Sequence, residues 1–117
     1  MDFDEYTLVM LTTPDPAPEF DADERALLQD AHLAFQRRMQ DEGLLLSAGP
    51  VLGPEDRRLR GVGIWSTDVL RTRELVAEDP AVAAGVFDTM VRAWLVPAGT
   101  MSFTPGTMPS SSAEARS

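Results

Sequence analysis

His32 is the residue of this chain with the most readily specified chemistry, because it is the sole histidine in 117 residues. It stands four residues after Leu28 and three before Phe35, in a stretch where apolar residues recur at helical spacing. It therefore flanks the face that we expect to be buried. An imidazole can take up or release a proton near neutral pH. The spacing alone predicts either an acid-base residue or a satisfied core or dimer-interface histidine.

Two reactive residue types are absent from the sequence, and their absence narrows the range of possible chemical mechanisms. The chain has no cysteine, which excludes disulfides, thiolate nucleophiles and zinc-thiolate sites. All ten basic residues are arginines, which excludes a Schiff-base lysine and the lysine of a phosphate-binding loop. No cluster of acidic residues stands out as a ligand set. We therefore expect no metal and no cofactor.

The charge balance points away from nucleic acids. The net charge is −9 and the isoelectric point is near 4.4, whereas nucleic acid binding needs basic patches. One short cluster, Arg57–Arg60, falls between two predicted strands and is expected to be a solvated turn. No apolar run approaches the roughly 20 residues that span a bilayer. The acidic N-terminus does not resemble a secretory signal. We therefore expect a cytoplasmic protein with no membrane partner.

Hydrophobic periodicity and breaker residues predict the elements that must position His32. A helix over about 23–42 carries it, with Gly43 as the stop. A buried strand follows and ends abruptly at Gly49-Pro50, since proline cannot donate to a sheet ladder. The remaining predicted elements are strands at 6–12, 60–66 and 88–96, a helix at 69–77 and a further helical turn opened by Asp79-Pro80.

The element order is β-α-β-β-α-β, which is the ferredoxin-like pattern of the α+β class. It predicts a four-stranded antiparallel sheet with both helices on one face. The other face carries apolar residues, so we expect a second copy of the chain to cover it in a homodimer. Residues 1–103 are predicted to form this domain. Residues 104–117 have no apolar periodicity and are expected to be a flexible tail.

Several short motifs occur along the chain in an order that is typical of a known family. They are His32 followed by Gly43, the stretch Leu45–Leu52, two glycines at 61 and 63, the stretch Glu78–Gly85 and Trp94. Over residues 5–103 this order resembles the YCII-related (YciI-like) family. The resemblance implies a dimeric α+β barrel, in which two ferredoxin-like subunits pack sheet to sheet. One departure is Ala81, where the family often has a larger apolar residue.

The resemblance also implies an active site made of His32 and Asp79. Ser47, Gly49 and Pro50 would form part of the pocket wall. Asp79 has an alternative role as the N-cap of the helix that Pro80 begins. Ser47 has an alternative role as a strand hydroxyl that bonds to the backbone.

Arg92 shares a strand face with Trp94. It could hold a substrate carboxylate if that face looks into the barrel. Otherwise it is an exposed strand charge.

The sequence thus leaves two kinds of function open. The first is a small-molecule enzyme that uses a His32/Asp79 pair for cofactor-free isomerisation or elimination. The resemblance also implies relatives that act on small molecules, because a few family members are similar to dehydrochlorinases and muconolactone isomerases, which are enzymes of aromatic breakdown. The second is a non-catalytic dimeric module that binds a small ligand or assists another protein. A long His32–Asp79 distance or a closed pocket would favour the second.

Overall fold

The computed structural model describes residues 1–53 and 58–116, so Arg57 of the predicted arginine turn lies outside them. The elements in chain order are β1 (Phe3–Thr12), α1 (Ala22–Asp41), β2 (Leu45–Pro50), β3 (Leu59–Trp65), α2 (Val69–Val76), α3 (Pro80–Ala83), β4 (Asp88–Pro97) and α4 (Ser112–Ala115). The predicted α+β class and the four-stranded antiparallel sheet are confirmed. Within the described ranges, none of the helices has the length and apolar character that a membrane span requires.

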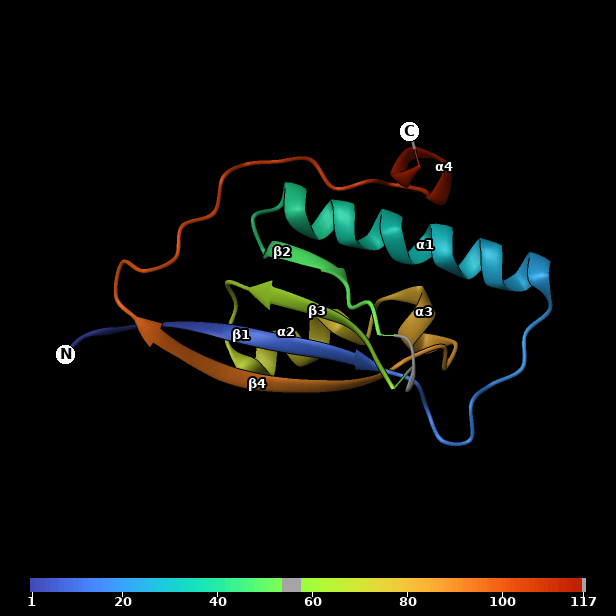
Figure 1. The fold of residues 1–117 in the computed structure, drawn as a ribbon, viewed down its shortest axis with the longest axis horizontal. Coiled ribbons are helices and arrows are strands. Elements are labelled where there is room, and N and C mark those ends of the chain that lie inside the picture. The colour runs from blue at the N-terminus through green and yellow to red at the C-terminus, as the bar shows by residue number, and fades with distance from the viewer. Residues whose placement is uncertain (54–57, 117) are drawn as a thin grey trace.

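The four strands lie in the order β2-β3-β1-β4 (Figure 1). Val9 at the centre of β1 pairs with Gly63 of β3 and with Val91 of β4. Successive side chains of a strand point to opposite faces. The face that carries Val9 is therefore shared by the odd-numbered residues of these three strands around that register.

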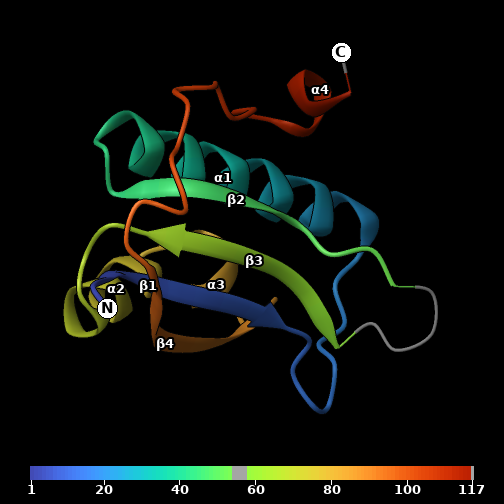
Figure 2. The ribbon, with the colours of Figure 1, turned by 60° about the vertical axis from the view of Figure 1, so that its left-hand side comes forward.

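The helices cover this face and form the core with it. Figure 2 shows the strands in front with α1 and α3 behind them. The buried core joins residues of the four strands to residues of α1, α2 and α3 and to Phe87: Val9, Leu11, Phe35, Met39, Leu45, Trp65, Leu75, Val76, Ala81, Phe87 and Val91. The helices pack on the sheet because their apolar stripes and this sheet face are the surfaces that folding removes from water.

Local signals in the sequence fix the two ends of α1. Asp21 is the N-cap, and its side chain accepts a hydrogen bond of 2.8 Å from the backbone N–H of Glu24. Gly43 follows the helix with a φ of +76°, a conformation that glycine adopts without a Cβ penalty. The chain can therefore turn directly into β2 and lay that strand beside α1.

The segment after β4 follows α1 rather than leaving the domain (Figure 1). The side chain of Gln40 donates to the carbonyl of Gly106 at 3.0 Å and accepts from the backbone N–H of Met108 at 2.8 Å. Asp30 accepts from the backbone N–H of Ser112 at 2.8 Å. In these bonds the C-terminal segment contributes only backbone groups, which every residue type has. Its composition therefore could not predict that it lies along α1. Its mobility in solution stays a prediction.

Candidate functional site

His32 lies on the sheet-facing side of α1 and is 6% exposed. Its Nδ1 is 2.6 Å from Oδ2 of Asp79, which is 47 positions later in the sequence. The two residues that the resemblance paired are therefore in direct contact. This geometry is compatible with acid-base chemistry, and their catalytic role stays a prediction.

Asp79 uses its two carboxylate oxygens for different partners. Oδ1 accepts the backbone N–H of Ala81 at 2.9 Å, which makes Asp79 the N-cap of α3. Oδ2 meets His32, and the residue is 2% exposed. The cap and the contact with the histidine were alternatives in the sequence, and one carboxylate serves both. The cap bond also fixes the orientation in which Asp79 presents Oδ2.

The contact decides which nitrogen of His32 is available for chemistry. An ionised carboxylate can only accept hydrogen bonds, so we assign the proton of the neutral imidazole to Nδ1. Nε2 is then the unprotonated nitrogen. In the described part of the chain, every fully buried side-chain nitrogen or oxygen has a hydrogen-bond partner. Because His32 bonds through Nδ1 alone, Nε2 is reached by solvent.

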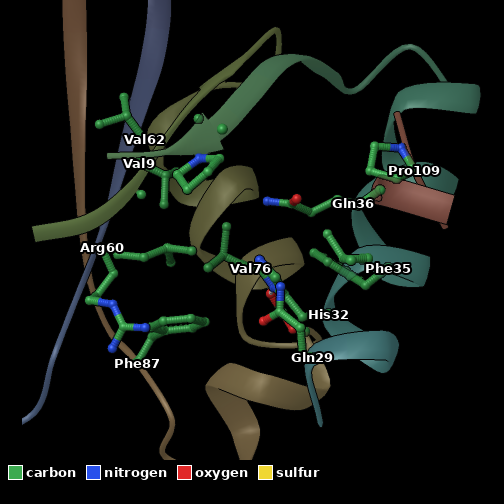
Figure 3. Close-up of a pocket in the computed structure, with 18 of the residues that line it drawn as sticks. Val9, Gln29, His32, Phe35, Gln36, Arg60, Val62, Val76, Phe87 and Pro109 are labelled. Atoms are coloured by element: carbon green, nitrogen blue, oxygen red, sulfur yellow. Dashed lines mark hydrogen bonds and ion pairs between the residues drawn. The ribbon is translucent and has the colours of Figure 1, made fainter. Parts of the chain in front are cut away.

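His32 and Asp79 line a cavity of about 380 Å³ between α1 and the sheet (Figure 3). Most of its wall is apolar and comes from β1, α1, β3, α2 and Phe87: Val9, Leu11, Leu33, Phe35, Trp65, Val76 and Phe87. Gly61 and Gly63 form part of the floor. A Cβ at Gly63 would lie 3.2 Å from Nε1 of Trp65, so a side chain there would crowd the wall. Such a cavity can hold a single-ring ligand.

The other predicted wall residues separate into two groups. Gly49 and Pro50 line the cavity, as expected of the bend that ends β2. Ser47 is exposed and is not among the lining residues. Arg92 is opposite Leu8 in the sheet register, which places it on the face away from His32. The structure does not bring Ser47 or Arg92 to this cavity.

Arg60 was expected where the solvated turn meets the strand at 60–66, and the structure places it in the strand. It is a half-buried residue of β3 that lines the cavity. Its guanidinium carbon lies 5.8 Å from the ring centroid of Phe87, whose ring is in turn 5.4 Å from that of His32. The alternating glycines at 61 and 63 were the available signal, because they indicate close approach of a ligand or backbone beside Arg60.

The C-terminal segment also reaches the cavity. Pro109, Ser112, Ala115 and Arg116 lie along its rim. The backbone N–H of Ser112 lowers the pKa of Asp30, and the charge of Arg116 acts in the same direction. Low-complexity sequence carried no signal for this placement.

The described residues contain no group of three or more His, Asp or Glu side chains placed to hold a metal ion. The arrangement at hand is therefore an imidazole oriented by a carboxylate, beside an apolar cavity with an arginine on its wall. Such a pair can move a proton to or from a ligand in the cavity.

Comparison with known proteins identifies a family and a similar fold. The model of the YCII-related domain matches residues 6–95. A solved structure of 5-chloro-2-hydroxyhydroquinone dehydrochlorinase from Burkholderia phenoliruptrix AC1100, in complex with 2,5-dihydroxybenzoquinone, is similar in fold with a TM-score of 0.57. It is 21% identical to this chain, and the alignment covers 76% of this chain and 92% of that one. A search of curated proteins finds no match.

Proposed function

Because this chain belongs to the YCII-related domain family, we propose that it is a small-molecule enzyme whose His32–Asp79 pair performs acid-base chemistry without a cofactor. The observation that carries the proposal is the 2.6 Å contact between Nδ1 of His32 and Oδ2 of Asp79 at the wall of an open cavity. The similar fold of a dehydrochlorinase supports an enzyme as the class of protein.

In the proposed reaction, Nε2 of His32 takes a proton from a carbon or hydroxyl group of the substrate. Asp79 stabilises the imidazolium that forms, because its carboxylate already accepts the Nδ1–H bond. In an isomerisation the imidazolium returns the proton to another atom of the same molecule. In an elimination a leaving group departs with its bonding electrons, and the proton passes to solvent or to that group.

The name of the similar protein favours the second of these reactions. A dehydrochlorinase removes hydrogen chloride, which is an elimination. The solved structure of that dehydrochlorinase holds 2,5-dihydroxybenzoquinone. We propose a ring of similar size as the substrate here. The apolar walls suit a ring, and a cavity of about 380 Å³ is within the usual range of small-ligand sites.

We also propose the ferredoxin-like topology and a homodimer through the open sheet face, which together would form the dimeric α+β barrel. The register puts Leu8 opposite Ile64, and Met10 opposite both Val62 and Met90, on the face without helices. Met90 is 40% exposed. An apolar sheet face of this kind favours a partner. Light scattering should show a dimer for the wild type and a monomer for Leu8→Glu, and a monomeric wild type would overturn this proposal.

Deuterium exchange tests the proposed proton transfer on small ring compounds, none of which has to be the natural substrate. Hydroxylated benzoquinones, chlorinated hydroquinones and muconolactone are incubated with the protein in D₂O and followed by proton NMR and absorbance. The wild type should exchange or convert at least one of them. His32→Gln should slow that process by about 10²-fold or more, since glutamine cannot act as a general base.

Two results would overturn the enzyme proposal. One is unchanged exchange in His32→Gln. The other is a wild type that binds compounds of the panel and catalyses neither exchange nor conversion, which would instead support the ligand-binding module. Circular dichroism of the variant confirms that any loss is not a loss of fold.

A further inference from the structure

We propose that the cavity beside His32 takes a small organic anion, a single-ring carboxylate or an ionised hydroxyquinone, and that Arg60 binds its negative group. This inference names the substrate class of the proposed enzyme, and it rests on that proposal only in taking the cavity as the substrate site. Three observations lead to it: the charge of the lining, the position of Arg60 and the apolar surface between Arg60 and His32.

The charge of the cavity lining is opposite in sign to that of the chain. The chain carries a net charge of −9. Among the described residues that line the cavity, the cations are Arg60 and Arg116, whereas the sole carboxylate is Asp79, which is already in contact with His32. An anion that enters this cavity therefore meets local positive charge in an otherwise acidic protein.

Of the two arginines, Arg60 is placed to fix a ligand. It is half-buried in β3, and its guanidinium lies against the ring of Phe87, which is 8% exposed. Figure 3 shows this guanidinium on the wall of the cavity beside Phe87, with His32 across from it. Arg116 is exposed, so solvent and salt screen its charge more strongly.

A guanidinium has five N–H donors in a planar fork. It can therefore keep a contact within the protein and still donate to a carboxylate or phenolate oxygen. Arg60, Phe87 and Gln29 also line a second cavity of about 570 Å³, so Arg60 stands on the wall that the two cavities share. Atoms of Arg60 therefore face both cavities.

The surface between Arg60 and His32 is apolar, which sets the shape of the ligand. The ring of Phe87 stands between Arg60 and His32. Its centroid lies 5.8 Å from the guanidinium carbon of Arg60 and 5.4 Å from the centroid of the imidazole ring. A single planar ring against this surface can place an anionic substituent at Arg60 and a reacting C–H or O–H group near Nε2 of His32. Binding energy from the anion would thus orient the reacting atom.

Benzoate and benzamide form a matched pair of probes, because they share a ring and differ in charge. Isothermal titration calorimetry should show that the wild type binds benzoate at least about tenfold more tightly than benzamide, as expected for a charge-assisted hydrogen bond. Arg60→Gln should lose most of this preference and retain its affinity for benzamide. Arg60→Lys, which keeps the charge without the fork, should fall between the two.

Arg71→Gln is the matched control, because Arg71 is an exposed arginine that pairs with Glu74 on α2 and does not line the cavity. Its preference for benzoate should equal that of the wild type. The inference is overturned if the wild type binds the two probes equally, if neither probe binds at millimolar concentration, or if folded Arg60→Gln and Arg60→Lys both keep the wild-type preference.

His32→Gln separates this inference from the proposed function. If Arg60 is the anion site, His32→Gln keeps the preference for benzoate while it loses deuterium exchange. Unchanged exchange in His32→Gln would refute the proposed chemistry and leave the anion site standing. A lost preference in Arg60→Gln with normal exchange of neutral compounds would support Arg60 as a residue that determines specificity.

Discussion

Substitution of Asp79 tests whether one carboxylate both caps α3 and orients His32. Asp79→Asn keeps an oxygen that can accept the Ala81 N–H at the position of Oδ1. It places an NH₂ group opposite Nδ1 of His32, in place of Oδ2. An NH₂ group donates, so the imidazole must accept at Nδ1 and carry its proton on Nε2. Asp79→Ala removes the cap and the partner of His32 together.

The geometry separates the two variants in free energy of unfolding. Asparagine is as good an N-cap as aspartate, so Asp79→Asn should cost about 1 kcal/mol, the difference between a charge-assisted and a neutral hydrogen bond. Asp79→Ala loses the cap and leaves a buried Nδ1–H without a partner, which together should cost about 2–4 kcal/mol. Both variants should slow proton exchange by about 10²-fold or more, because neither leaves Nε2 as an oriented base.

Urea denaturation measures the stabilities, and deuterium exchange into the best compound of the panel measures the chemistry. Asp68→Ala is the matched control, since Asp68 caps α2 through the Arg71 N–H at 2.8 Å and does not touch the cavity. It should lose about 1 kcal/mol and keep full activity. Wild-type exchange in Asp79→Asn would refute the tautomer argument, and equal stability of Asp79→Asn and Asp79→Ala would refute the double role.

Three further predictions concern the walls of the cavity and the segment at its rim. Gly63→Ala should lower the free energy of unfolding by about 1–3 kcal/mol, because its methyl would lie 3.2 Å from Nε1 of Trp65; an unchanged melting temperature would contradict this. Phe35→Ala should cost about 3–5 kcal/mol by urea denaturation, since Phe35 is 2% exposed, and Phe35→Leu should cost clearly less. The backbone N–H of Ser112 is the main cause that lowers the pKa of Asp30. The contact is therefore fully present above the ordinary pKa of 3.8. It is lost when the pH falls below 3.8 and passes the lowered pKa of the folded protein. The NMR shift of the Ser112 amide should follow that transition in the wild type and not in Asp30→Asn.

Local chemistry made much of the fold predictable. The N-cap at Asp21 and the stop at Gly43 each depend on interactions within a few residues, so the sequence placed both ends of α1 within about one residue. The same holds for the start of α3 at Asp79-Pro80, and Gly85, with a φ of +82°, follows the end of this helix. The alternation of β4 likewise divided its side chains between the two faces.

Tertiary structure decided which of these residues meet. His32 and Asp79 are 47 positions apart, and the sequence paired them through a family resemblance, since periodicity does not encode such a distance. Arg60 and Arg92 are both strand arginines, and the position of Arg60 against Phe87 depends on how β3 packs under the helices. The C-terminal segment is held in part through its backbone groups, which leave no trace in composition.

Caps, stops and strand alternation were thus determined by the sequence itself, because their energies come from neighbours along the chain. The cavity, the arginine on its wall and the segment at its rim were decided by the packing of α1 on the sheet, because they arise from contacts between elements that share no sequence neighbourhood.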